Sequence, residues 1–290
     1  MINRQYKDSV FSLLFSNPNL LRRLYCALED VELPPDTPVI INTLENVLFK
    51  GLINDISFVI GGKLVVLVEH QSTINPNMAV RFLMYLNDIY KRMSDAKALH
   101  SNKLLRLPKP EFIVLYNGVD PYPDEQFLRL SETFENTAEL GLPEKDRPAL
   151  ELEVHVLNIN ESRNEARANR CKELAEYSAF VTKVRELRPP DGATLEEQEE
   201  AMKMAVRSCI KLGILKEFLK AHAREVIGMQ LTEWNLDDAI AVAREEGIEE
   251  GLERGLEKTA RNALAKGLPL DVIQDITGLD RETLKNLTDT

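Results

Sequence analysis

The stretch that decides the fold runs from Asp55 to Gln71 and reads DISFVIGGKLVVLVEHQ. Valine, isoleucine and phenylalanine dominate the runs on either side of Gly61-Gly62, and a glycine pair between two such runs is typical of a β-hairpin. We therefore predict two antiparallel strands joined by a tight turn. An acid, Asp55, opens the first strand, and Glu69 and Gln71 close a second strand that is otherwise apolar.

These three polar residues form the candidate site. Side chains alternate along a strand, so Glu69 and Gln71 point to the same face, about 6–7 Å apart along the backbone. A carboxylate at the end of a buried strand costs free energy unless something compensates it, and a divalent metal ion is one candidate. The spacing indicates a metal-dependent nuclease centre.

The length of the loop decides whether Asp55 reaches the same face. A two-residue Gly61-Gly62 loop would pair Asp55 with Val68 and leave it on the face opposite Glu69. A three-residue loop, or one β-bulge, would instead set Asp55 beside Glu69. The catalytic interpretation therefore requires a register that the simplest turn does not give.

Composition narrows the class of protein. The chain has 290 residues, 44% hydrophobic and 29% charged, which is ordinary for a globular protein with one sizeable core and a smaller unit. We expect no signal peptide and no membrane span. Cys26, Cys171 and Cys209 fit neither a disulfide framework nor a zinc site, so we expect a reducing, cytoplasmic location.

Charge is distributed unevenly along the chain. The net charge of −11 argues against a protein that coats nucleic acid without specificity. Directly after the hairpin, however, residues 80–110 hold seven basic residues and two acids, a net charge of +5. The basic residues are Arg81, Lys91, Arg92, Lys97, Lys103, Arg106 and Lys109. They are candidates to hold phosphates, with a solvated surface as the alternative.

The remaining pattern completes an α/β (mixed α+β) fold with an all-helical C-terminal region. The periodicity predicts, in order, a helix over 6–28 interrupted at Pro18, a strand over 39–50, the hairpin, a helix opened by Asn75-Pro76, a buried strand over 111–116, a half-buried edge strand over 150–159, and only helices from Asn164 onward. We place the domains at 1–165, 166–235 (a helical extension) and 236–290.

The C-terminal region contains a repeat in which Gly247, Gly251 and Gly255 recur every four residues of a predicted acidic helix. Such a stripe predicts close approach of another helix and favours a homo-oligomer, with intrachain packing or a polar linker as alternatives. The tail after it resembles a helix-turn-helix. Residues 237–290 hold seven basic residues against thirteen acids, so protein assembly is favoured over DNA reading.

In its motifs, taken together and in order, the chain resembles the recombination-promoting nuclease (Rpn) family, also described as PD-(D/E)XK nuclease family transposases. The segments that carry the resemblance are Lys7-Asp8-Ser-Val-Phe with Leu14-Phe15, Asp55, Glu69-x-Gln71, Leu115-Tyr-Asn-Gly118, and the Gly-Glu-rich tail with Ile276-Thr-Gly-Leu279. The resemblance covers most of the chain and is weakest between about residues 161 and 231.

The resemblance implies a restriction-endonuclease-like core, a mixed central sheet flanked by helices, and Mg²⁺-dependent DNA cleavage with Mn²⁺ as a substitute. It assigns the catalytic positions to Asp55, Glu69 and Gln71. The metal ligands would be the two carboxylates and the backbone carbonyl of His70, while Arg81, Lys91 and Arg92 would bind DNA phosphates. We expect auxiliary roles for Asp8 and Glu45 only as a minor alternative.

One departure from the pattern concerns Gln71, which stands where the nuclease motif usually has lysine. An amide can orient water or phosphate by hydrogen bonds but cannot neutralise charge. Two interpretations follow. The first is an active endonuclease linked to recombination or mobile elements, and the second is a catalytically weak DNA-binding or protein-assembly protein with the same fold.

Overall fold

The computed structural model describes residues 10–41, 56–94, 96–140, 147–190, 192–266, 268–279 and 284, with only the backbone described at 96, 98, 138, 232, 233, 235–253 and 265. Residues 1–231 and 232–290 form two compact units. The predicted domain boundaries at 165/166 and 235/236 stay predictions.

The first unit is built around a mixed sheet whose strand order is β1-β2-β3-β4-β6-β5. Its strands are β1 (Val39–Ile41), β2 (Ile56–Ile60), β3 (Leu64–Gln71), β4 (Lys109–Tyr116), β5 (Glu125–Arg129) and β6 (Glu153–Asn158). The helices of the chain are α1 (Val10–Leu14), α2 (Pro18–Leu28), α3 (Met78–Met93), α4 (Ala96–Leu99), α5 (Glu165–Ala168), α6 (Lys172–Glu186), α7 (Leu195–Leu212), α8 (Lys216–Ala265) and α9 (Leu270–Thr277), with short 3₁₀ turns η1 (Leu130–Thr133) and η2 (Ala138–Leu140).

The hairpin between β2 and β3 has a three-residue loop. Ile60 pairs with Leu64 and Ile56 pairs with Val68, which leaves Gly61, Gly62 and Lys63 in the turn. Both glycines have positive φ, 57° and 67°, a conformation that disfavours residues with a Cβ. The register that the catalytic interpretation requires is therefore confirmed, and the two-residue alternative is wrong. Asp55 itself lies outside the described residues, as do Asp8 and Glu45.

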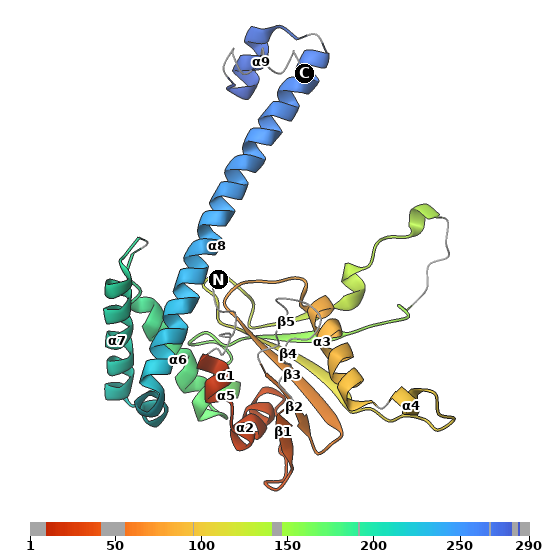
Figure 1. Cartoon of the computed structure of the whole chain (residues 1–290), viewed down its shortest axis with the longest axis vertical. Helices are drawn as coiled ribbons and strands as arrows, with labels where there is room; N and C mark the ends of the chain where they lie inside the picture. Colours follow the sequence, from red (N-terminus) through yellow and green to blue (C-terminus); the bar gives the residue numbers. More distant parts are fainter. Residues whose placement is uncertain are drawn as a thin grey trace. The chain divides into compact units, whose positions relative to one another are not determined.

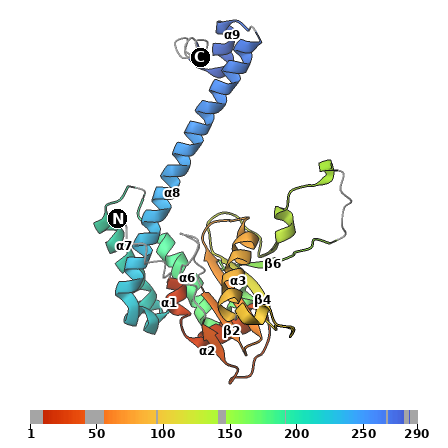
Figure 2. The ribbon, with the colours of Figure 1, turned by 45° about the vertical axis from the view of Figure 1, so that its right-hand side comes forward.

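Two layers of helices cover the sheet (Figures 1 and 2). α3 crosses one face and returns the chain so that β4 runs parallel to β3, which a tight turn could not do. Its apolar side chains, among them Met78, Phe82 and Ile89, pack on Val65, Leu67 and other buried residues of the strands. α1, α2 and α6 lie on the other face, where Phe11 and Tyr177 meet the ring of His70.

Two sequence predictions about this sheet need correction. The strand predicted as an edge, β6, pairs with both β4 and β5 and is therefore internal. The edge strand next to β6 is β5, which the sequence analysis did not predict because its polar and exposed residues lack a strand pattern. The predicted interruption at Pro18 is confirmed, since α1 ends before it and α2 begins with it.

The described part of the C-terminal region is helical, as predicted. Thr194 opens α7 with the predicted capping box to Glu197, and Gly278 ends α9 with φ of 69°. In the second unit, Ala260, Ile273 and Leu284 form a small core. Among the residues that the structure describes, nothing lies within 4 Å of a Cβ added to Gly255.

Two further observations concern the whole described chain. Cys26, Cys171 and Cys209 are free thiols, in agreement with the absence of a predicted disulfide framework. Among the described helices, none has the length and apolar character needed to cross a membrane.

Candidate metal centre

Glu69 is the chemically most unusual residue of the sheet. Its side chain lies at the carboxyl end of β3, between β2 and β4, on the face that α3 covers, and the residue is only 3% exposed. An ionised carboxylate in such a place needs a compensating charge or several hydrogen bonds. The sequence prediction that the strand ends in a buried acid is thus met by the described structure.

Arg81 supplies a compensating charge in this structure. Its Nη2 lies 3.4 Å from each carboxylate oxygen of Glu69. Charge-assisted hydrogen bonds are usually about 2.7–2.9 Å long, so this pair is held more by charge than by a close hydrogen bond. The same Nη2 donates a shorter hydrogen bond, 2.8 Å, to the hydroxyl of Tyr85 one helical turn further on.

Tyr85 completes a cluster with Glu69 and Arg81 that the sequence analysis did not predict. The ring is buried against Phe82, and Arg81 contacts its hydroxyl through Nε as well, at 3.2 Å. Burial, followed by the negative charge of Glu69, raises the pKa of Tyr85 above its usual range. The hydroxyl therefore stays protonated at neutral pH. The signal that could have found the cluster is the i, i+4 spacing of Arg81 and Tyr85 on one helix.

Gln71 points to the same face as Glu69 and meets the first turn of α3. Its Nε2 donates to the sulfur of Met78 at 2.8 Å, and its backbone carbonyl accepts from the amide of Asn117 at 2.9 Å. Because a thioether sulfur is a weak acceptor, this contact holds the amide less firmly than an oxygen would. The structure thus brings together Glu69, Gln71 and Arg81 of the predicted residues.

The imidazole of His70 points to the opposite face of the sheet. It stacks on Phe11 with ring centroids 5.4 Å apart, and its Nε2 lies 3.2 Å from the hydroxyl of Tyr177. Burial, then the positive charge of Arg185, lowers the pKa of His70 to about 3. The ring is neutral and packs in the core on the opposite face. Of His70, only the backbone can therefore contribute to a site at Glu69.

Lys91 and Arg92 lie at the other end of the sheet. They end α3, and the strand that follows enters beside Leu64, where β3 begins. Leu64 and Glu69 are five residues apart, roughly 16 Å along an extended strand. These two cations are therefore separated from the Glu69 cluster, whereas Arg81 is part of it.

A polar network that sequence analysis did not predict supports the carboxyl ends of β4 and β6. Arg185 of α6 donates to the backbone carbonyl of Asn117 and, at 3.1 Å, to Oδ1 of Asn160. The turn after β4 is tight, because a Cβ on Gly118 would lie 2.1 Å from the carbonyl oxygen of Ser72. The Asn-Gly and Asn-x-Asn pairs after the two strands were the available signal.

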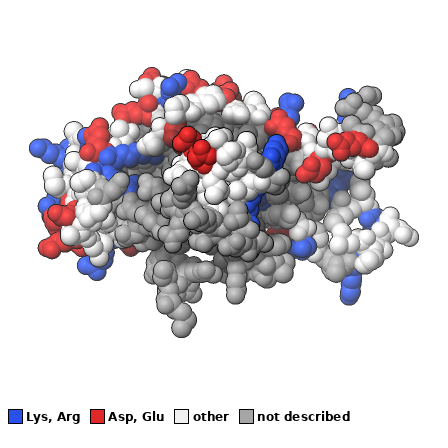
Figure 3. Space-filling view, turned by 90° about the horizontal axis from the view of Figure 1, so that it is seen from above, with Lys and Arg blue, Asp and Glu red and all other residues white. Residues whose placement is uncertain are grey.

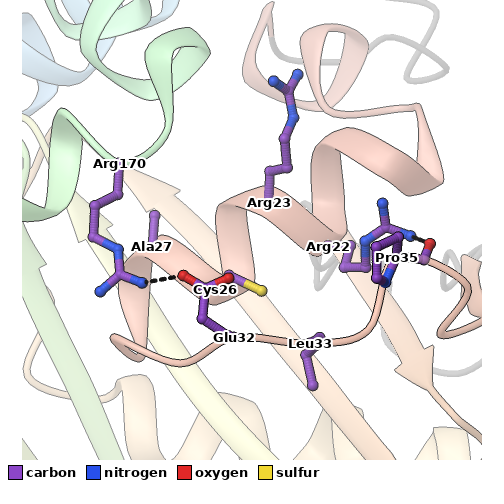
Figure 4. Close-up of a pocket in the computed structure, with 8 residues that line it drawn as sticks. All are labelled: Arg22, Arg23, Cys26, Ala27, Glu32, Leu33, Pro35 and Arg170. Atoms are coloured by element: carbon purple, nitrogen blue, oxygen red, sulfur yellow. Dashed lines mark hydrogen bonds and ion pairs between the residues drawn. The ribbon is translucent and has the colours of Figure 1, made fainter.

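A cavity on the α2 side of the sheet is distinct from this cluster. It has a volume of about 220 Å³ and is lined by Arg22, Arg23, Cys26, Ala27, Glu32, Leu33, Pro35 and Arg170. Figure 4 shows Arg170 directed at Glu32 and Arg22 at the carbonyl of Pro35. Arg23 is bound to Glu173 at 2.6 Å. The arginines serve contacts within the chain, so we regard this cavity as structural.

The donor chemistry of the cluster fits a hard divalent cation. Carboxylate and amide oxygens are ligands of the kind that Mg²⁺ prefers, and Glu69 offers a buried carboxylate. Within the described residues, no group of three or more His, Cys, Asp or Glu side chains is arranged to hold a metal ion. The second acid that the sequence analysis assigns to the site, Asp55, lies outside the described residues.

Comparison with known families agrees with this architecture. The strand order and the flanking helices are consistent with a restriction-endonuclease-like fold, and the family matched below belongs to the PD-(D/E)XK nuclease-like group. Residues 46–159 match the family described as Putative transposase, YhgA-like, a stretch that includes β2, β3, β4, β5 and β6. Over this segment the match supports the family resemblance, and the description of the matched family suggests a function related to mobile elements. No curated protein and no solved structure gives a match to this chain.

Proposed function

We propose that this protein is a Mg²⁺-dependent DNA endonuclease that hydrolyses phosphodiester bonds in recombination or mobile-element activity, with Mn²⁺ able to replace Mg²⁺. The observation that carries the proposal is the buried carboxylate of Glu69 at the carboxyl end of β3, two residues before Gln71. The three-residue hairpin loop supports it, because that loop is the one the hypothesis requires.

In this proposal each residue of the site has a separate role in hydrolysis. Asp55, Glu69 and the backbone carbonyl of His70 hold the metal ion. When bound, Mg²⁺ lowers the pKa of a water ligand and stabilises charge that develops at phosphorus. Gln71 orients the attacking water or a phosphate oxygen through hydrogen bonds. It carries no charge, so it contributes less neutralisation than a lysine would.

Arg81 has two partners available in the proposed site. In this structure it neutralises Glu69 and is held by Tyr85. With Mg²⁺ bound to Glu69, the guanidinium would be released to bind the phosphate next to the bond that is cut, as the sequence analysis assigned it. Arg is suited to this, since its planar fork matches phosphate oxygens. Lys91 and Arg92 would bind phosphates further along the DNA.

Cleavage of an end-labelled DNA duplex in Mg²⁺ tests the proposal. Wild type should cut, Glu69→Gln should not, and Glu111→Gln should cut like wild type. Glu111 is a suitable control because it is also a partly buried strand carboxylate, but it accepts a hydrogen bond from Tyr25 on the other face. Cutting by Glu69→Gln at the wild-type rate would refute the proposed centre.

The second candidate is a catalytically weak protein that binds DNA or assembles with partners. Two observations favour it: Arg81 is placed at Glu69, and glutamine replaces the motif lysine. The two candidates differ in one result, since the weak protein would bind the duplex in Mg²⁺ and leave it intact.

For either candidate we propose assembly through the C-terminal helices, and a cytoplasmic location that fits three free thiols.

A further inference from the structure

The end of the sheet opposite the Glu69 cluster gathers basic residues from three separate parts of the chain. Lys63 lies in the hairpin loop, and the amide of Lys109 at the start of β4 donates to its carbonyl at 2.8 Å. α3 runs back along the sheet and brings Lys91 to the same end. The connection from α3 to β4, residues 94–108, adds Lys97, Lys103 and Arg106. We call these six residues the basic end.

The charges of the basic end are exposed and only partly neutralised. All six residues are exposed. Lys91 lies 3.8 Å from Asp88, and Lys109 lies 3.3 Å from Glu111. For Lys63, Lys103 and Arg106, no carboxylate among the described residues lies within ion-pair distance of 4.0 Å. On the right-hand side of Figure 3, blue side chains stand among white ones in the lower part, and red ones lie above them. A chain with a net charge of −11 thus keeps a local surplus of positive charge here.

The distance from this surface to the cluster matches a short stretch of duplex. From Arg81 to Lys91 the helix axis rises by about 15 Å. Along β3, the five residues between Leu64 and Glu69 span about 16 Å. Base pairs are stacked about 3.4 Å apart, so either path equals roughly four to five base pairs.

We propose that the basic end is a second phosphate-binding surface, which holds the backbone of duplex DNA about four to five base pairs from the phosphate that lies at the Glu69 cluster. The inference rests on the proposed function for the position of the cut, but not for the binding of DNA. In this arrangement one end of the sheet binds the duplex and the opposite end cleaves it. Exposed leucines in the same connection, Leu99 and Leu104, would fit a protein partner instead.

Binding of a fluorescent duplex of 20 base pairs to the full chain in EDTA tests the inference without cleavage. The variant Lys103→Gln/Arg106→Gln is compared with Lys211→Gln/Lys216→Gln, which removes two exposed charges from helices away from this end. Loss of two phosphate contacts lowers the slope of log affinity against log salt by about 1.8. A fourfold rise in salt should therefore weaken wild type about tenfold more than the first variant, and the control variant as much as wild type.

The outcomes separate this inference from the proposed function. A reduced slope in the first variant supports the basic end even if no preparation cuts DNA. Equal slopes in wild type and both variants, or no binding of duplex by wild type, would overturn it.

A second measurement uses duplexes with the cut site placed two or eight base pairs from one end. The shorter arm should weaken binding of wild type, and it should weaken binding of the Lys103→Gln/Arg106→Gln variant by a smaller factor.

Discussion

The guanidinium of Arg81 lies 3.4 Å from both carboxylate oxygens of Glu69. The two residues are the only described pair in which a carboxylate at the carboxyl end of β3 meets a cation from α3. The arrangement places positive charge where the proposed function needs a metal ion. Arg81 and Mg²⁺ should therefore compete for the same carboxylate, and this competition can be measured.

Removing the charge of Arg81 should make the protein depend on Mg²⁺. In Arg81→Met, Glu69 keeps its burial but loses its cation, an arrangement that costs up to about 3–5 kcal/mol in buried pairs and less here, because the Arg81 side chain is 25% exposed. We expect a lower melting temperature without metal and a larger rise on adding Mg²⁺ than in wild type. Arg106→Met, an exposed arginine, is the control for thermal melting. Equal Mg²⁺ shifts in all three proteins would contradict the competition.

Glu69→Gln should abolish metal binding rather than merely weaken it. Loss of an outer-shell partner reduces metal affinity roughly 10–100-fold, and loss of a direct ligand should exceed that. Isothermal titration of Mg²⁺ or Mn²⁺ into wild type, Glu69→Gln and the control Glu111→Gln measures the effect. Wild-type affinity in Glu69→Gln would exclude this carboxylate as a ligand.

Gln71→Lys should increase the cleavage rate. The amide of Gln71 donates a hydrogen bond to the sulfur of Met78, a weak acceptor, so a lysine there would exchange a weak contact for a positive charge near the phosphate. Single-turnover cleavage in Mg²⁺ measures the change, and Gln71→Met, of similar length but without a polar head, is the matched control. A large loss of rate in Gln71→Lys would show that the amide has a role that charge cannot replace.

The pair formed by Glu29 and His155 predicts how the stability of the folded protein depends on pH. The hydrogen bond from His155, then its positive charge, lowers the pKa of Glu29 below that of an ordinary carboxyl, although burial opposes this. A lowered pKa stabilises the folded state above the unfolded pKa, and this contribution disappears as pH falls through the folded pKa. Glu29→Gln should therefore be less stable than wild type by about 1 kcal/mol near pH 6. The difference should shrink as pH falls below the ordinary glutamate pKa of about 4.3 and vanish once pH is below the lowered pKa of Glu29 in the folded protein. Urea unfolding at several pH values measures it, with exposed Glu135→Gln as control. A difference independent of pH would contradict this account.

The glycine repeat predicts an effect on assembly. No described residue lies within 4 Å of a Cβ added at Gly255, so Gly255→Leu should fold as a single chain while blocking close approach of a second one. Light scattering should show a larger species for wild type than for this variant. Gly228→Leu, at another open glycine of α8, is the control. A monomeric wild type at working concentration would exclude the homo-oligomer.

Local chemistry in the sequence was enough to predict the hairpin, the buried acid and the helix ends. Alternating apolar residues and Gly61-Gly62 specify β2 and β3, and the capping box at Thr194 specifies the start of α7. The family match bears out the fold in which these elements are arranged. Asp55 and its role stay a prediction, because it lies outside the described residues.

Features that depend on partners distant in sequence could not be predicted in the same way. β5 is a strand because β6 offers it an edge, not because Glu125–Arg129 has a strand pattern. Similarly, nothing in residues 80–93 alone shows that Arg81 faces Glu69 while Lys91 lies at the opposite end of the sheet. The two residues are separated because α3 runs back along the sheet, in the direction opposite to β3. This direction is known from the pairing of β4 with β3, in which the start of β4 lies beside the start of β3.

Nicking of supercoiled plasmid is the most direct test of the central claim that the hairpin carries a metal-dependent nuclease. Purified wild type and Asp55→Ala are incubated with plasmid in Mg²⁺, in Mn²⁺ and in EDTA, after circular dichroism has shown that both are folded. We predict nicking by wild type in either metal ion, none in EDTA, and none by Asp55→Ala. Intact plasmid with folded wild type in both metal ions, or equal nicking by Asp55→Ala, would contradict the account.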